Sequence, residues 1–256
     1  MRRPTGTPSS HGGATAHYEA LLADIYGWMV GDLATACAAG RSELETLGVG
    51  AAPPRGRVLD LGAGLGVHAV PLTEMGWEVF AVDTSEALLA QLVRREPRVH
   101  ALHANLVQAA ERVEGTFELI VCMGDTLTHL DSEDALDLAL AGAASRLAPG
   151  GRLVLRFRDY VTRVRLGAER FLLVRADATR ILTCCLDFEP QRVLVTDVVH
   201  QLEDGAWTLR ASSYRKLRLA REAVVRTLEA LGLEVSTPEV TSAWIDVVAT
   251  RPRLVA

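Results

Sequence analysis

A glycine-rich turn beside an acidic residue is the part of this sequence whose residue types most directly indicate chemistry. The run Val58-Leu-Asp-Leu-Gly-Ala-Gly-Leu-Gly-Val67 places a strand pattern directly before Gly62, Gly64 and Gly66. Glycines let a ligand approach the backbone, and the amide groups that open a following helix attract negative or polar ligand atoms. The segment therefore predicts a ligand site at the end of a strand.

Two acidic residues restrict the chemistry of that ligand. The spacing of the glycines differs from the GxGxxG pattern of dinucleotide sites, which makes a nucleotide-dependent oxidoreductase the weakest interpretation. Asp60, beside the turn, would repel a pyrophosphate but suits an ammonium group. Asp83 ends the next strand pattern and can accept hydrogen bonds from two ribose hydroxyls. We therefore expect a positively charged nucleoside; the alternative is that both carboxylates only cap turns.

The elements that must position these residues alternate between strand and helix patterns. Such an alternation predicts an α/β fold with a doubly wound, mostly parallel sheet. Consecutive strand patterns with short turns then predict an antiparallel β insertion before the last helix. We expect an N-terminal tail over 1–15, a helical lid over 16–50, an α/β core over 51–158, the insertion over 159–217 and completion of the core over 218–256. Pro71, inside a helix expected over 66–75, should remove one backbone hydrogen bond.

These motifs resemble the class I S-adenosylmethionine-dependent methyltransferases, whose Rossmann-like sheet has seven strands. The resemblance covers about residues 55–158 and rests on Asp60-x-Gly62-x-Gly64-x-Gly66, Asp83, Ala104-Asn-Leu106, the strand Phe117–Met123 and Leu147-Ala-Pro-Gly-Gly151. It implies S-adenosyl-L-methionine as cofactor and S-adenosyl-L-homocysteine as product.

The resemblance also assigns the cofactor contacts. Asp60 and the turn residues Gly62, Ala63, Gly64 and Gly66 would hold the methionine end. Asp83 would bind the ribose, with Thr84 also in contact with the cofactor. Asn105 and Leu106 would line the adenine, and Met123 and Gly124 the sulfonium. The family usually has an acid where Asn105 stands; a turn residue with local backbone bonds is the alternative for Asn105.

A finer likeness links the chain to the glycine N-methyltransferase group. It rests on Val121–Leu130, Phe157–Tyr160, the antiparallel run and the early segment Tyr26–Asp32. Members of that group place an N-terminal helical segment over the active site. The arginine that matches Arg158 binds the substrate carboxylate in glycine N-methyltransferases, although Asp159 replaces the amide that usually follows it.

Candidate catalytic and substrate residues follow from this likeness and from their places near strand ends. His129 is a candidate general base or polar anchor. Tyr26 and Tyr214 are candidate catalytic residues, and Arg158, Tyr160 and Trp28 are candidate substrate-binding residues. The alternatives are an ion pair of Arg158 with Asp159 or Asp125, a packing role for His129, and core or rim positions for the tyrosines and Trp28.

The expected reaction is transfer of a methyl group to a nitrogen atom of a small molecule, and an oxygen atom is the second choice. The small molecule could carry a carboxylate. Methyl transfer from a sulfonium needs in-line geometry and desolvation, and no metal. A methyltransferase acting on protein or RNA, and a non-methylating S-adenosylmethionine-binding protein, are the alternatives. The insertion strands could shape the acceptor pocket, bury a homodimer surface, or both.

Composition limits the remaining classes of function. The 256 residues are 49% hydrophobic and 23% charged with a net charge of −5, which gives no broad basic surface for nucleic acid. No run approaches ~18 uninterrupted apolar residues, so no membrane span is expected. The N-terminus lacks a secretory pattern, which predicts a cytoplasmic protein. The four cysteines show no metal-ligand spacing.

Overall fold

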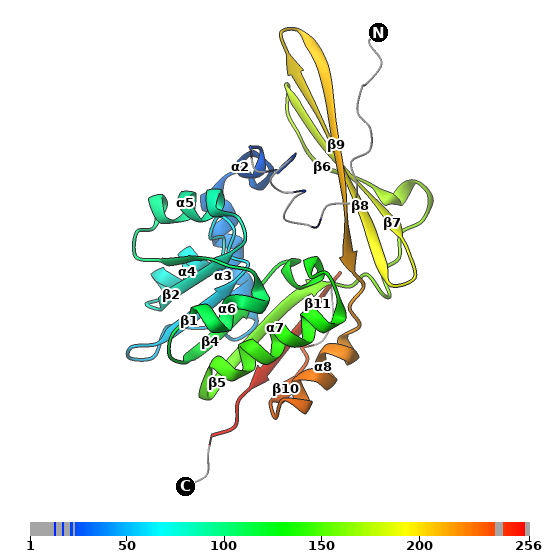
Figure 1. The fold of residues 1–256 in the computed structure, drawn as a ribbon. Helices are drawn as coiled ribbons and strands as arrows, with labels where there is room; N and C mark the ends of the chain where they lie inside the picture. Colours follow the sequence, from blue (N-terminus) through cyan, green and yellow to red (C-terminus); the bar gives the residue numbers. More distant parts are fainter. Residues whose placement is uncertain (1–12, 14–16, 18–20, 23, 239–242, 254–256) are drawn as a thin grey trace.

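Two β-sheets organise the chain, which we describe from a computed structural model (Figure 1). The description covers residues 13, 17, 21–22, 24–238 and 243–253. Most of the predicted tail over 1–15 therefore lies outside the described residues.

The larger sheet has seven strands in the order β10-β11-β5-β4-β1-β2-β3. Its strands are β1 (Arg57–Leu61), β2 (Glu78–Asp83), β3 (His100–His103), β4 (Phe117–Cys122), β5 (Leu147–Arg158), β10 (Glu234–Ser236) and β11 (Trp244–Thr250). β1 to β5 pair in parallel, whereas β11 runs antiparallel to both β5 and β10. This arrangement confirms the predicted fold class. The strand order reverses between β1 and β4, and open α/β sheets bind ligands at such a point.

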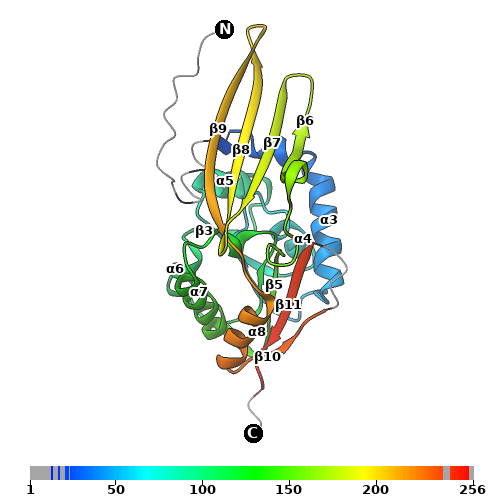
Figure 2. The same cartoon turned by 90° about the vertical axis from the view of Figure 1, so that its right-hand side faces the viewer.

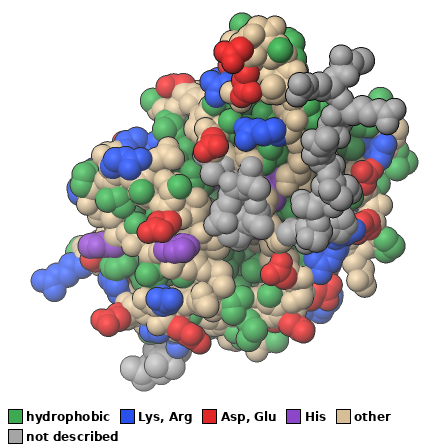
Figure 3. Space-filling model, turned by 45° about the horizontal axis from the view of Figure 1, so that its top comes forward, with side chains coloured by type: hydrophobic (Ala, Val, Ile, Leu, Met, Phe, Trp, Pro, Cys, Tyr) green, Lys and Arg blue, Asp and Glu red, His purple; other side chains and the backbone are tan. Residues whose placement is uncertain are grey.

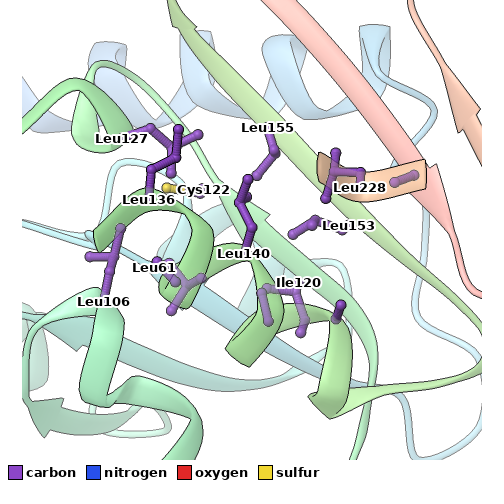
Figure 4. Packing of buried hydrophobic residues seen from close by; sticks show 14 of the residues in the cluster. Leu61, Leu106, Ile120, Cys122, Leu127, Leu136, Leu140, Leu153, Leu155 and Leu228 are labelled. Carbon is purple, nitrogen blue, oxygen red and sulfur yellow. The ribbon is translucent and has the colours of Figure 1, made fainter. Parts of the chain in front are cut away.

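Helices cover both faces of this sheet, because its strands are apolar on both sides. One face packs against α3 (Leu33–Thr46), α4 (Ala69–Glu74) and α5 (Glu86–Arg95). The other packs against α6 (Leu106–Arg112), α7 (Glu133–Arg146) and α8 (Arg221–Ala230). Figure 4 shows the second core, where Leu136 and Leu140 of α7 meet Ile120, Leu153 and Leu155 of the sheet.

The helix ends follow local side-chain chemistry. Ser85, the N-cap of α5, accepts a hydrogen bond from the amide of Leu88. Ser132 caps α7 in the same way through Ala135. The expectation for Pro71 is confirmed, although α4 begins at Ala69 rather than Gly66. The amides of Val70 and Leu72 donate to the carbonyls of Gly66 and His68, at 3.0 Å each. Pro71 lies between them and has no N–H, so it removes one bond from this ladder.

The smaller sheet is an antiparallel meander of β6 (Phe171–Ala176), β7 (Arg180–Phe188), β8 (Arg192–Glu203) and β9 (Ala206–Leu217), in that order. It rises beside the end of the larger sheet, next to the short helix α2 (Tyr26–Val30) (Figures 1 and 2). Leu21, Leu22 and Ile25 of the N-terminal segment pack against Leu182 and Val199 of this sheet. The N-terminal segment and the insertion therefore enclose a space above the larger sheet.

The surface shows no field of a single charge on the face seen in Figure 3, where acidic and basic side chains are interspersed. None of the helices in the described part of the chain is long and apolar enough to cross a membrane. The same residues contain no cluster of three or more histidine, cysteine, aspartate or glutamate side chains that could hold a metal ion.

Candidate active site

The predicted glycine turn joins β1 to the segment before α4 and is packed tightly on two sides. A Cβ atom at Gly62 would lie 2.3 Å from Cγ2 of Thr126, and one at Gly66 would lie 2.3 Å from Cδ1 of Leu92. At Gly64, where φ is +53°, the nearest atom would be the Tyr26 hydroxyl at 3.7 Å. Gly62 and Gly66 thus permit close packing of the turn, whereas Gly64 borders open space.

That open space is a cavity of about 290 Å³, lined by the predicted nucleoside residues Asp83, Thr84, Asn105 and Leu106. Asp83 accepts hydrogen bonds from the amide of Gly64 at 2.7 Å and from the amide of Ser85 at 2.8 Å, one on each carboxylate oxygen. Each oxygen keeps a second lone pair for a ribose hydroxyl. Burial raises the pKa of Asp83 above its ordinary value.

Asn105 has both of the roles weighed for it. Its side-chain oxygen accepts a hydrogen bond from the amide of Gln108 at 2.9 Å, which makes it the N-cap of α6. It also lines the nucleoside cavity beside Leu106. The Asn105 side chain can therefore offer an adenine ring its NH₂ group and the second lone pair of its oxygen.

Asp60 lies at the end of β1 and is 1% exposed. Its Oδ2 atom has no hydrogen-bond partner among the described protein atoms. Burial raises the pKa of Asp60 to about 6, opposed by His68 and assisted by Asp83. A buried carboxylate oxygen without a partner is costly. A ligand ammonium would satisfy it directly or through one water, so this residue fits the methionine end of the expected cofactor.

A second cavity, of about 470 Å³, meets the first at five shared lining residues, which are Tyr26, Gly62, Gly64, Thr126 and His129. The larger sheet contributes Met123, Gly124 and Arg158 to its lining. The opposite wall comes from the inner face of the small sheet and is mainly apolar: Leu172, Leu182, Leu186, Phe188 and Val195. The predicted insertion therefore forms a wall of the acceptor side.

Asp125 is the centre of a polar network in this second cavity. Its Oδ2 atom accepts hydrogen bonds from the Lys216 ammonium at 2.6 Å and from the Tyr160 hydroxyl at 2.7 Å. Burial would raise the pKa of Asp125, but the charge of Lys216 and its hydrogen bonds hold it below its ordinary value. Sequence reasoning missed Lys216. The available signal was its singularity, since it is the only lysine in the chain.

The polar groups at the junction of the two cavities are uncharged. Burial, together with the positive charge of Lys216, lowers the pKa of His129 to about 3. Burial raises the pKa of Tyr26 to about 12 and also raises that of Tyr214. An imidazole with so low a pKa is a weak base, which favours the polar-anchor interpretation of His129 over that of a general base.

Two other predicted substrate residues have partners within the protein. The Arg158 guanidinium stacks over the Trp244 ring at 4.3 Å and lies 3.9 Å from Asp125 while still lining the acceptor cavity. Trp28 does not line either cavity. Its indole N–H donates to Asp177 at 2.6 Å, in the turn between β6 and β7. Trp28 therefore holds the N-terminal segment to the insertion, and its predicted role in substrate binding does not fit this position.

Comparison with known proteins agrees with this geometry. Residues 58–151 match a family profile described as a methyltransferase domain. The chain is 32% identical to a glycine/sarcosine N-methyltransferase of Aphanothece halophytica over 108 residues, which is 41% of each chain. It is 30% identical to the glycine N-methyltransferase of Rattus norvegicus over 184 residues, which is 64% of this chain and 62% of the rat protein.

Two solved structures share the fold over most of the chain. The sugar N-methyltransferase KedS8 from Streptoalloteichus superposes with a TM-score of 0.73 at 17% identity, covering 99% of this chain and 100% of that one. S-adenosylmethionine-bound CalS10, an amino pentose methyltransferase from Micromonospora echinaspora, superposes with a TM-score of 0.71 at 20% identity. The superposition covers 89% of this chain and 95% of that one.

Residues 58–151 form a methyltransferase domain, and the chain as a whole has the fold of the class I S-adenosylmethionine-dependent methyltransferases. The alignments to the first curated relatives span only about two fifths of those proteins' length. The matched segment 58–151 contains the glycine turn, Asp83 and Asn105. It does not contain the small sheet that forms the acceptor wall.

Replacing Gly64 by alanine is expected to weaken binding of the methyl donor. The new methyl group meets no protein atom closely, but it enters the nucleoside cavity. Gly232→Ala is a matched control, because Gly232 also has a positive φ, of +80°, and open space around it. Both variants should lose about 1–2 kcal/mol of stability from backbone strain. Calorimetry with S-adenosylhomocysteine should show a loss of at least about tenfold in affinity for Gly64→Ala alone. Equal affinities of the two variants would contradict this placement of the donor.

Affinity for the methyl donor is also expected to fall as the pH is lowered through about 6. The raised pKa of Asp60 means that its carboxyl is protonated and neutral below that pH in the free protein. A bound ammonium favours the charged carboxylate, so binding must release a proton there. Calorimetry of S-adenosylhomocysteine binding from about pH 5 to about pH 8 measures the change. Asp60→Asn should flatten the profile, and an equally steep profile in that variant would assign the proton to another group.

Proposed function

We propose that this protein transfers the methyl group of S-adenosylmethionine to an amine nitrogen of a small molecule. The observation that carries the proposal is the junction at Gly64, Tyr26 and His129, where the nucleoside cavity opens into the acceptor cavity. The names of the curated relatives, which are N-methyltransferases of glycine and sarcosine, support nitrogen as the acceptor atom.

Different residues would bind the methyl donor and the acceptor. Asp83 would hold the ribose, Asn105 and Leu106 the adenine, and Asp60 the ammonium of the donor. When bound, S-adenosylmethionine supplies a methyl group already activated by its sulfonium. Met123 and Gly124 line the cavity where that sulfonium would lie and help to exclude water from it.

The uncharged junction favours an amine that arrives neutral. Transfer moves one positive charge from sulfur to nitrogen, so the acceptor nitrogen needs a lone pair but no proton acceptor at that step. The Tyr26 hydroxyl and the neutral His129 imidazole can position that nitrogen by hydrogen bonds. A hydroxyl acceptor would need a base, and the low pKa of His129 makes it a poor one. Arg158, at the open side of the cavity, could hold a carboxylate of the acceptor.

A turnover assay tests the proposal. The protein is incubated with S-adenosylmethionine and a panel of glycine, sarcosine and D-glucosamine, and S-adenosylhomocysteine is measured by mass spectrometry. Production that depends on an added amine supports N-methylation. Tight donor binding without product from amines, together with product from matched alcohols, would indicate O-methylation instead.

Two finer expectations are also proposals. Cytoplasmic location is supported by four free thiols, at Cys37, Cys122, Cys184 and Cys185, which suit a reducing compartment.

A homodimer is supported by the outer face of the small sheet. There, four side chains are more than half exposed: Phe171, Leu173, Trp207 and Leu209. This face would pack against the same face of a second copy, and sedimentation velocity would measure the resulting mass.

A further inference from the structure

Asp197 places a carboxylate in the apolar wall of the acceptor cavity. It lies on β8 between Val195 and Val199, is 7% exposed, and lines the cavity. Its cross-strand neighbour on β7 is Cys184, which lines the same cavity. Burial and the neighbouring carboxylate raise the pKa of the Cys184 thiol to about 12, so this neighbour remains uncharged.

The partner of Asp197 comes from the N-terminal segment. The His17 imidazole lies 2.9 Å from Asp197 Oδ2 and is 2% exposed. Its ring also contacts the Tyr214 ring, with 4.3 Å between centres, and Tyr214 in turn contacts His129 at 5.5 Å. A row of aromatic rings thus connects the Asp197–His17 pair with the junction where the donor and acceptor cavities meet.

A purely structural latch does not require a buried carboxylate at this position. The same N-terminal segment is already held to the small sheet by Trp28 and Asp177, in the turn between β6 and β7 and outside both cavities. Burying a carboxylate costs free energy that a hydrophobic residue would avoid. Asp197 faces the acceptor cavity, whereas Asp177 does not. The difference between the two contacts is therefore access to a ligand.

We propose that Asp197, oriented by His17, binds a hydrogen-bond donor of the acceptor, such as a hydroxyl, at a distance from the nitrogen that is methylated. The inference rests on the proposed function and narrows its substrate class to amines that carry a second polar group. Such an acceptor extends from the junction at His129 along Tyr214 to Asp197, with its carbon skeleton against Leu182, Leu186 and Val195. It is larger than an amino acid such as glycine.

Two matched amines test this inference. Calorimetry in the presence of saturating S-adenosylhomocysteine compares trans-4-aminocyclohexanol with cyclohexylamine, which lacks only the hydroxyl. The unmodified enzyme should bind the amino alcohol at least about tenfold more tightly, as expected for a hydrogen bond to a charged group. Asp197→Asn should reduce this preference to less than about threefold while S-adenosylhomocysteine affinity is retained. Asp177→Asn, which alters the other contact with the N-terminal segment, should keep the preference.

The possible outcomes separate this inference from the proposed function. Failure of the unmodified enzyme to bind S-adenosylhomocysteine would contradict both. If the unmodified enzyme binds S-adenosylhomocysteine but does not prefer the amino alcohol, the inference alone is overturned. The same holds if it binds S-adenosylhomocysteine but neither amine. Both results come from the unmodified enzyme, without any variant. Equal effects of Asp197→Asn and Asp177→Asn on both amines would assign Asp197 to a structural latch and would also overturn it.

Discussion

Lys216→Met is expected to destabilise the protein by about 3–5 kcal/mol, the usual cost of removing one partner from a buried ion pair. Lys216 and Asp125 have side chains only 10% and 13% exposed, and their charged atoms lie 2.6 Å apart. Methionine fills a similar volume but leaves the Asp125 carboxylate with only the more distant and more exposed Arg158 guanidinium, at 3.9 Å. Tyr160 and Thr128 still donate hydrogen bonds to Asp125, yet neither neutralises its charge. Urea unfolding at neutral pH measures the loss.

The pH dependence of that loss has a defined sign. In the unmodified protein the pKa of Asp125 is lowered, so its contribution to stability is present above the unfolded pKa and is lost as the pH falls through the folded value. Without Lys216, burial is opposed mainly by hydrogen bonds and the pKa of Asp125 should rise. The loss of stability in Lys216→Met should therefore be largest at neutral pH. It should become smaller as the pH falls and Asp125 is protonated.

A double variant and a surface pair serve as controls for this prediction. Asp125→Asn combined with Lys216→Met removes both charges and should recover part of the lost stability. Arg41→Gln breaks the more exposed pair with Glu74, whose side chain is 53% exposed, and should change the unfolding midpoint little. A loss of less than about 1 kcal/mol in Lys216→Met would mean that the network around Asp125 does not need the cation.

The parts of the site that could be predicted from sequence are local in the chain. Asp60, Gly62, Gly64 and Gly66 belong to one strand and the turn after it, so their spacing alone determines how they meet. Asp83 ends the adjacent parallel strand, and parallel strands place their ends at the same edge of the sheet. The alternation of strand and helix patterns, and the consecutive strand patterns after it, likewise predicted the mostly parallel sheet and the antiparallel insertion.

The missed parts depend on contacts between distant segments. Lys216 meets Asp125 across 91 positions of sequence, and His17 meets Asp197 across 180. Side chains of a strand alternate between its two faces, and this alternation does not say which face of β9 will line a cavity. The sequence near Lys216 therefore does not show whether its side chain points inward or outward. Trp28 shows the converse case: the family likeness suggested a substrate contact, but the turn between β6 and β7 supplies its partner.

Asp83→Ala is expected to weaken binding of S-adenosylhomocysteine roughly 10- to 150-fold, from hydrogen bonds to a charged group worth about 1.5–3 kcal/mol. The substitution removes both acceptors for the ribose hydroxyls. It also frees the amide of Gly64, which Asp83 holds at 2.7 Å, and so loosens the turn that borders the donor. Calorimetry at neutral pH gives the dissociation constant, and thermal unfolding without ligand separates this effect from a loss of stability.

The matched control is Asp32→Ala. Asp32 also accepts a hydrogen bond from a backbone amide, that of Thr35 at 2.8 Å, but it lines neither cavity. Its loss should cost stability as an N-cap does, about 1 kcal/mol, without changing donor affinity. If Asp83→Ala instead matches Asp32→Ala, with lower stability and an unchanged dissociation constant, Asp83 only shapes the turn and the ribose must lie elsewhere. If donor affinity falls in Asp83→Ala alone, the carboxylate at the end of β2 is the ribose ligand, and the orientation of the donor between Asp60 and Asn105 follows from it.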